Sequence, residues 1–453
     1  MDNRRTVLIV STAAAFLTPF MAASLNIALP TIGREFNMNA VALGWVATTY
    51  LLAAAIGLVP FGRLADMTGR LGIFTWGSLV YALSSVLSTV AHSGGILLAT
   101  RAVQGLGGSM VMSTGVAMLT AAYPPGDRGR VLGINVSSTY LGLSLGPVLG
   151  GFLTQNLGWR SIFWLNGACG LVVFILAVTH LKAEDHEPRR ERFDIPGAVL
   201  LGLALTGIML GLSRLPKTAG IGLLGGGLIC LAGFIRVERS VAAPLLDVSL
   251  FSSNSVFAFS NLAALINYSA TAAVGFLLSL YLQEVKVLSP QKAGLVLIAQ
   301  PAMMAFFSPL AGRLSDKIEP RYLASAGMGI TVVGLALLAL FGSSTGVLLV
   351  SAVLIILGLG FALFSSPNTN AVMSSVERSR YGIASATLGT MRFTGQMLSM
   401  GVAMLIFALH LGRARITPET APQFLAAQRT AFIFFAAVCL AGVFASLKRG
   451  HIR

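Results

Sequence analysis

Long apolar stretches alternate with short polar segments from one end of this 453-residue chain to the other. A helix that crosses a bilayer needs about 20 mostly apolar residues. Lipid admits only helices and closed barrels, because every backbone polar group must be satisfied within the protein. The stretches lack the apolar and polar alternation of barrel strands. The pattern therefore predicts membrane-spanning helices, fourteen in number.

The expected spans come as six, then a closely spaced pair, then six more. In chain order they cover residues 7–30, 41–61, 71–91, 96–123, 131–153, 162–181, 197–212, 221–235, 257–282, 293–312, 323–341, 347–373, 383–411 and 430–447.

Composition supports a membrane protein and explains the strong basic charge. The chain is 55% hydrophobic and only 10% charged, with a net charge of +15. An even number of spans places both termini on one side. That side carries 20 Lys and Arg residues against 9 on the other, as expected if it is cytoplasmic. We therefore attribute the basicity to topology in a multi-pass inner (cytoplasmic) membrane protein, and expect no nucleic-acid partner.

An internal repeat divides the chain into two halves. The segment GRLADMTGR at 62–70 recurs as GRLSDKIEPR at 312–321, each time after an even-numbered span. Two intervening spans keep both halves in the same orientation, as in a parallel repeat. We expect an all-α membrane protein with a six-helix bundle at 1–182, a cytoplasmic linker at 183–196, two inserted helices at 197–236 and a second six-helix bundle at 237–453.

Enzyme, cofactor and metal signatures do not fit this chain. A phosphate loop requires a Gly-Lys pair, and the sequence has none. GLSLG and GIGLLG match hydrolase and dinucleotide patterns but lie within apolar helices. The cysteines, Cys169, Cys230 and Cys439, fall in three separate spans and are expected to be packing residues. We expect neither an enzyme nor a resident cofactor or metal.

Several motifs together resemble the major facilitator superfamily. GRLADMTGR is similar to its loop between helices 2 and 3, RAVQGLGGS at 101–109 to its helix 4, and GLSLGPVLGG at 142–151 to its antiporter motif in helix 5. The resemblance implies a conformational latch formed by Gly62, Asp66, Gly69, Arg70, Gly312 and Asp316. It implies an antiporter motif of Gly142, Gly146, Pro147, Gly150 and Gly151, whose bend would seal the outer path.

Further segments narrow the resemblance to one branch of that superfamily. DIPG at 194–197, YLQEVKVLSP at 281–290, MRFTGQ at 391–396 and the two central spans are similar to the fourteen-helix drug/proton antiporters, the relatives of EmrB and QacA. The resemblance implies multidrug export by alternating access, with protons as a candidate coupling ion.

The chain departs from that branch where the first helix typically carries an aspartate. Met21 occupies that position, and none of the sixteen acids lies near the middle of a span. Two arginines, Arg101 and Arg392, do lie within spans, where a charge usually faces a cavity and has a role. The simpler alternative for Arg101 is snorkelling toward the outer surface. We expect the cavity to favour neutral or anionic amphiphiles.

The expected substrate-binding residues are polar side chains on cavity-lining helices of the superfamily, each of which could instead make an ordinary interhelical hydrogen bond. They are Asn26, Tyr50, Arg101, Gln104, Tyr140, Asn261, Asn267, Tyr268, Gln300, Asn368, Asn370, Arg392 and Gln396.

Two alternatives to drug export remain open at this stage. A lipid or amphiphile flippase of the same fold needs no central acid if its substrate enters sideways. A membrane sensor would bind a ligand without moving it, although the sequence offers no sizeable soluble output domain. We expect a monomer in the bilayer with a small molecule as its partner.

Overall fold

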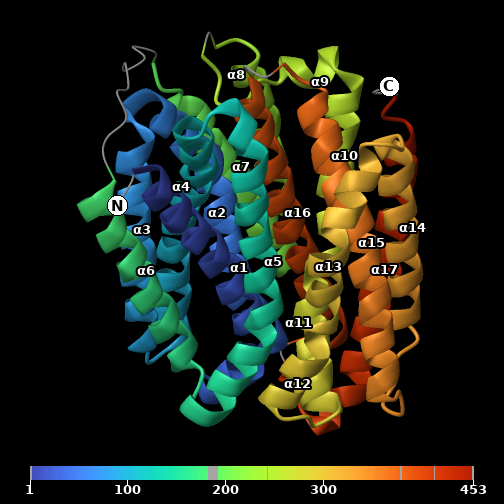
Figure 1. The fold of residues 1–453 in the computed structure, drawn as a ribbon. Coiled ribbons are helices and arrows are strands. Elements are labelled where there is room, and N and C mark those ends of the chain that lie inside the picture. Colours follow the sequence, from blue (N-terminus) through green and yellow to red (C-terminus); the bar gives the residue numbers. More distant parts are fainter. Residues whose placement is uncertain (1–2, 182–191, 242, 378–379, 413, 451–453) are drawn as a thin grey trace.

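The computed structural model describes residues 3–181, 192–241, 243–377, 380–412 and 414–450. Within these residues fourteen helical segments are long and apolar enough to cross a membrane, which confirms the predicted number. They form an all-helical bundle with both ends of the chain toward the same face (Figure 1). We call this face the terminal face and the other the distal face. Most of the linker expected at 183–196 lies outside the described residues.

The first half contains six long helices followed by the inserted pair. Their bounds are α1 Asn3–Glu35, α2 Ala40–Thr68, α3 Arg70–Thr89, α4 Gly94–Ala122, α5 Pro125–Leu157, α6 Arg160–His180, α7 Ile195–Arg214 and α8 Thr218–Glu238.

The second half is more segmented than the first, because short helices interrupt two of its spans. Its elements are α9 Ser249–Ser253, α10 Ser255–Thr271, α11 Ala273–Leu280, the π-helix η1 Tyr281–Val285, α12 Pro290–Leu297, α13 Ala299–Ser315, α14 Pro320–Leu338, α15 Val347–Ser374, α16 Tyr381–His410, the 3-10 helix η3 Pro418–Thr420 and α17 Ala421–Leu447.

Side-chain caps fix where several helices begin. Asn39, Asp194 and Asn254 each accept a hydrogen bond from the backbone N–H three residues later, at 2.9 Å. Such caps satisfy amides that have no partner inside the helix. They set the starts of α2, α7 and α10 at the edges of the apolar runs.

Each half packs mainly within itself, and the halves meet along two seams. In the first half α1 packs on α5, and α3 packs between α4 and α6. In the second half α14 packs on α15 and α17, and α10 packs on α16. The seams are α2 against α16 and α5 against α12. The α7–α8 hairpin packs at the edge, where α7 contacts both α2 and α16.

Two local expectations need correction. The segment at 62–70 is not a loop: α2 continues to Thr68, and only Gly69, with φ of 107°, separates it from α3. Likewise α13 continues to Ser315. The reason is that the residues of both repeat segments can continue the backbone hydrogen bonds of the preceding helix. Each helix therefore ends only at the first residue that interrupts these bonds. At Gly69 the positive φ is one that glycine adopts without strain.

Candidate substrate cavity

A cavity of about 2600 Å³ lies between the two halves. Its wall comes from α1, α2, α4 and α5 on one side and from α10, α11, α13, α15 and α16 on the other. Its rim includes Asp66, Arg128, Asp316 and Tyr381, which lie where α2, α5, α13 and α16 begin or end at the terminal face. The cavity is therefore open toward the terminal face.

The distal face is closed by contacts between the halves. Ser279 Oγ donates to the Asn26 carbonyl oxygen at 2.5 Å, and Gln283 Nε2 donates to the Ile27 carbonyl oxygen at 2.9 Å. Glu284, in the π-helix, lies 3.8 Å from Arg34 of α1. π-helical segments are rare and occur frequently at functional sites. The arrangement has one closed and one open end, which is the geometry of one state of an alternating-access transporter.

The predicted antiporter-motif glycines lie at close helix contacts. A Cβ built on Gly146 would lie 2.6 Å from Ala23 Cβ, and one built on Gly150 would lie 2.6 Å from Ser24 Cα. One built on Gly142 would meet the Phe16 carbonyl. Small residues permit such approach between membrane helices. The motif therefore packs α5 against α1.

Two members of that motif lie at the seam between the halves. A Cβ on Gly151 would lie 2.6 Å from the Pro290 carbonyl oxygen, and the Pro147 carbonyl is close to Gly294 of α12. This places the motif at the closed distal half of the cavity, although α5 runs as one helix through Pro147.

Arg101 is enclosed in the first half. Its side chain is 1% exposed. Its Nε donates to the Val46 carbonyl oxygen at 3.2 Å, its Nη1 donates to Gln104 Oε1, and its guanidinium lies 4.6 Å from the Tyr50 ring centroid. A guanidinium has five N–H donors, and here α2 and α4 supply its partners. Arg101 therefore lies within the protein and does not snorkel to the surface.

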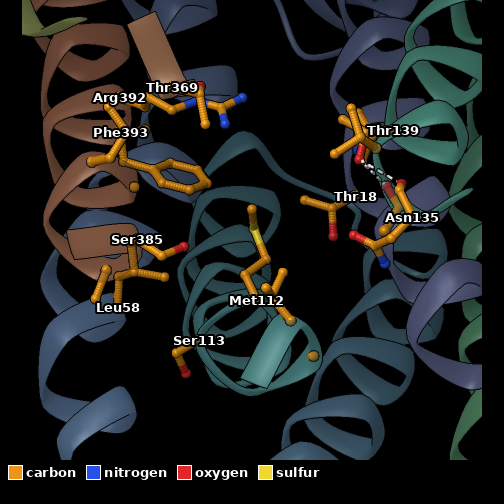
Figure 2. A pocket seen from close by; sticks show the side chains of 18 of the residues that line it. Thr18, Leu58, Met112, Ser113, Asn135, Thr139, Thr369, Ser385, Arg392 and Phe393 are labelled. Carbon is orange, nitrogen blue, oxygen red and sulfur yellow. Dashed lines mark hydrogen bonds between the residues drawn. The ribbon is translucent and has the colours of Figure 1, made fainter. Parts of the chain in front are cut away.

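Arg392 is half-buried and borders the open cavity. Its guanidinium lies 5.1 Å from the ring centroid of Tyr268, and that ring packs edge-on against Phe361 at 5.4 Å. Figure 2 shows the Arg392 side chain beside Thr369 on one side of the cavity, with Thr18, Asn135 and Thr139 on the other. In the described part of the chain, no carboxylate lies within 4 Å of Arg392.

The remaining expected residues divide into two groups. Those at the cavity wall together with the two arginines are Asn26, Tyr50, Tyr140, Tyr268, Gln300, Asn370 and Gln396. Those that are buried and do not line it are Gln104, Asn261, Asn267 and Asn368. Expecting these four at the wall was wrong. Gln104, Asn261 and Asn368 instead make hydrogen bonds between or along helices, whereas the buried amide atoms of Asn267 have no hydrogen-bond partner in the described chain.

The hydrogen bonds of these buried residues show the reason. Gln104 Nε2 donates to Ser85 Oγ at 2.6 Å, Asn261 Nδ2 to the Phe257 carbonyl oxygen at 2.9 Å, and Asn368 Nδ2 to the Ser260 carbonyl oxygen at 3.1 Å. Sequence reasoning missed Asn135, which lines the cavity and donates from Nδ2 to the Ser11 carbonyl oxygen at 3.1 Å. An isolated Asn on an apolar helix gives no signal that separates these cases.

The expected latch residues lie at the cavity rim but differ between the halves. Gly62, Asp66, Arg70, Gly312 and Asp316 line the cavity. Asp66 Oδ1 accepts from Arg70 Nη2 at 3.1 Å, within the same repeat segment. Asp316 Oδ1 accepts from Asn370 Nδ2 of α15 at 3.4 Å.

Charge along the cavity is uneven. Among the described lining residues the acids are Asp66, Asp247 and Asp316, all at the terminal rim. Met21 is buried, with 1% of its surface exposed. The lining arginines are Arg63, Arg70, Arg101, Arg128, Arg130, Arg192 and Arg392. The cavity therefore carries an excess of positive charge and, within the described chain, no acid beyond its rim.

Comparison with known proteins agrees with this architecture. The family model described as Major Facilitator Superfamily matches residues 12–400 and 260–450. The riboflavin transporter RibZ of Clostridioides difficile is 29% identical over 98% of this chain and 97% of its own length. The cephamycin export protein CmcT of Amycolatopsis lactamdurans is 33% identical over 92% and 88%. The multidrug resistance protein Stp of Mycobacterium tuberculosis is 29% identical over 91% and 77%.

Structural comparison supports the same fold. A bacterial homologue of the human lysosomal transporter Spinster, in an inward-facing and unoccupied conformation, aligns with a TM-score of 0.72 and 17% identity. The alignment covers 99% of this chain and 97% of that one. A transporter family accords with the expectation that the protein is not an enzyme. With fourteen spans, a cavity between two helical halves and a family match over most of its length, the chain belongs to the major facilitator superfamily.

Proposed function

We propose that this transporter exports small amphipathic organic compounds, with a preference for neutral or anionic ones, by alternating access. The observation that carries the charge preference is Arg392 at the cavity wall, with no carboxylate partner in the described chain. Lipophilic cations are usually countered by a carboxylate or an aromatic cage. An unpaired guanidinium would repel them and could bind a carboxylate, sulfonate or phosphate group.

The proposed orientation places the terminal face in the cytoplasm of an inner membrane. The excess of Lys and Arg on that side supports it. The units that move against each other are 1–182 and 237–453, with 197–236 as an inserted hairpin. The described state would then receive substrate from the cytoplasm, and the distal contacts would separate during export.

Proton coupling, which the similarity to drug/proton antiporters implies, would need an acid other than one at the position of Met21. Acids occur at the terminal rim, and Glu284 lies near the closed distal end. Transport in vesicles with and without an imposed pH gradient would reveal coupling. We expect substrate to move down its own gradient when the pH gradient is absent.

The charge preference can be tested with two fluorescent dyes of matched size and hydrophobicity, one anionic and one cationic. In proteoliposomes we expect the anionic dye to be transported at least about tenfold faster at low concentration, equivalent to about 1.4 kcal/mol of discrimination. Vesicles without protein provide the baseline for passive leakage. Efficient transport of the cation alone would refute the proposal.

A second candidate is a lipid or amphiphile flippase. The lining of α5 includes every residue from 132 to 141. Successive helix residues are about 100° apart, so these side chains point in all directions around the helix. This favours a cavity that reaches both sides of α5 and admits an amphiphile from the bilayer. Translocation of a fluorescent lipid between the leaflets of the same proteoliposomes would support the flippase. If the lipid does not move between the leaflets, the flippase is excluded.

A further inference from the structure

Two buried carboxyl groups meet at the base of the inserted hairpin. Asp194 caps the start of α7, and Glu238 is the last residue of α8, so the antiparallel pair brings them together near the terminal face. Asp194 is 5% exposed and Glu238 is 3% exposed. Neither residue belongs to the predicted latch, antiporter motif or substrate site.

Each carboxyl group uses one oxygen and leaves the other without a donor. Asp194 Oδ1 accepts from the Gly197 N–H at 2.9 Å, and Glu238 Oε2 accepts from the Leu246 N–H at 2.9 Å. The buried atoms Asp194 Oδ2 and Glu238 Oε1 accept no hydrogen bond from another described residue. A Cβ built on Gly197 would contact both atoms, with Glu238 Oε1 at 2.8 Å. The two free oxygens therefore converge on one point.

Electrostatics makes a doubly ionised pair unfavourable at this place. Like charges disfavour each other's ionisation, and burial removes the water that would solvate them. One bound proton removes the repulsion between the two charges, because it neutralises one carboxyl group. The same proton is donated to the free oxygen of the other group, which replaces the lost solvation. We propose that Asp194 and Glu238 form a proton-binding site that holds one proton shared between the two carboxyl groups.

The cations near this pair leave it uncompensated. Arg192, Arg236 and Arg239 are exposed, and none forms an ion pair with either carboxylate in the described chain. Besides its hairpin partner α8, the helices α2 and α16 pack on α7. On α2 the charged groups toward this face are Arg63 and Asp66, and Asp66 pairs with Arg70. Just before α16 the charged group is Arg380, which pairs with Asp247.

The site is connected to the mouth of the cavity through one segment. Residues 243–247, which we call the strap, line the cavity. The strap is bound to α8 by the Leu246 N–H to Glu238 bond, and to the start of α16 by Asp247, 3.7 Å from Arg380. When the proton leaves, repulsion between the carboxylates separates Glu238 from Asp194 and loosens the strap. The site thus makes access to the cavity depend on pH at the terminal face.

The test measures protonation and strap position without measuring transport, so it can fail independently of the proposed function. Infrared difference spectra of the purified protein between about pH 6 and pH 8 should show a buried carboxylic acid that loses its proton. The band should disappear in Glu238→Gln. In Ala243→Cys, labelling by a thiol reagent should increase with pH by about fivefold more than in Ala243→Cys combined with Glu238→Gln, since glutamine cannot ionise and the pair then never carries two negative charges.

Controls and contrary outcomes are defined by the same variants. Glu377→Gln alters an exposed acid near the same face. It should leave the infrared band as in the unmodified protein and, combined with Ala243→Cys, the labelling as in Ala243→Cys alone. If Glu238→Gln fails to fold, Asp194→Asn serves the same purpose from the other side of the pair. Absence of the infrared band, or identical labelling profiles with and without Glu238, would overturn the proposal. A strap that responds to sodium at constant pH would overturn it as well.

Discussion

The two membrane-embedded arginines occupy opposite halves of the protein and are used in opposite ways. Arg101 is 1% exposed, donates to Val46 and Gln104, and stacks near Tyr50. Arg101 reaches the cavity wall as Arg392 does, but Arg392 is only half-buried there, and its guanidinium lies over the Tyr268 ring. Both are followed by a glutamine three or four residues later. The comparison teaches that an arginine within a span can either hold helices together or remain available to a ligand, and that partners decide which.

The largest effect should come from removing the enclosed arginine. Arg101→Ala leaves the buried Gln104 Oε1 without its donor and removes the additional donor to the Val46 carbonyl oxygen of α2. A buried acceptor that loses its donor costs about 1 to 3 kcal/mol, and the lost contact with Tyr50 adds to this. We expect a marked loss of thermal stability in detergent, measured by unfolding of the purified protein. An unchanged unfolding midpoint would mean that Arg101 does not hold α2 and α4 together.

The two glutamines test the same difference with neutral side chains. Gln104→Ala removes bonds to Arg101 and Ser85, and an unsatisfied buried polar group costs about 1 to 3 kcal/mol. Gln396→Ala alters a residue at the cavity wall, so its effect on stability should stay within about 0.5 kcal/mol. Both are measured by the same thermal unfolding. Equal losses of stability in the two variants would mean that the buried Gln104 and the cavity-wall Gln396 do not differ in their structural role.

The cavity arginine should affect binding more than stability. Arg392→Ala should weaken binding of the anionic dye about tenfold, or about 1.4 kcal/mol, because a charge-assisted contact is lost. A neutral compound of similar size serves as the control and should bind as before. Arg392→Lys keeps the charge but not the planar fork, so we expect an intermediate result. Equal weakening for both compounds would indicate a structural role.

The smallest effects should appear at the rim, where the repeat residues differ. Asp66→Asn should slow turnover about threefold with little change in substrate affinity, because an exposed ion pair is worth less than about 1 kcal/mol. Asp316→Asn keeps an oxygen that can accept from Asn370 and should slow turnover less. Initial rates over a range of substrate concentrations separate the two quantities. A large loss of affinity in either variant would remove it from the latch.

The sequence was sufficient for features that depend on position along the membrane normal. Hydropathy predicted the number of spans, and spacing placed Arg101 and Arg392 inside them. It was insufficient for features that depend on rotation about a helix axis. Gln104 and Gln396 look alike in the chain, but only Gln396 lines the cavity. The segmentation into α11, η1 and α12 was also missed, because a π-helix changes the hydrogen-bond ladder without changing the apolar pattern.

The distal closure separates the gate from substrate recognition. Ser279 and Gln283 bond to the main-chain oxygens of residues 26 and 27, which any amino acid would supply. The side chain of Asn26, on the other hand, belongs to the cavity wall. A mutation at residue 26 can thus alter which compounds fit while the lock beside it keeps both acceptors. Substrate selectivity can therefore change at this position without loss of the barrier to leakage.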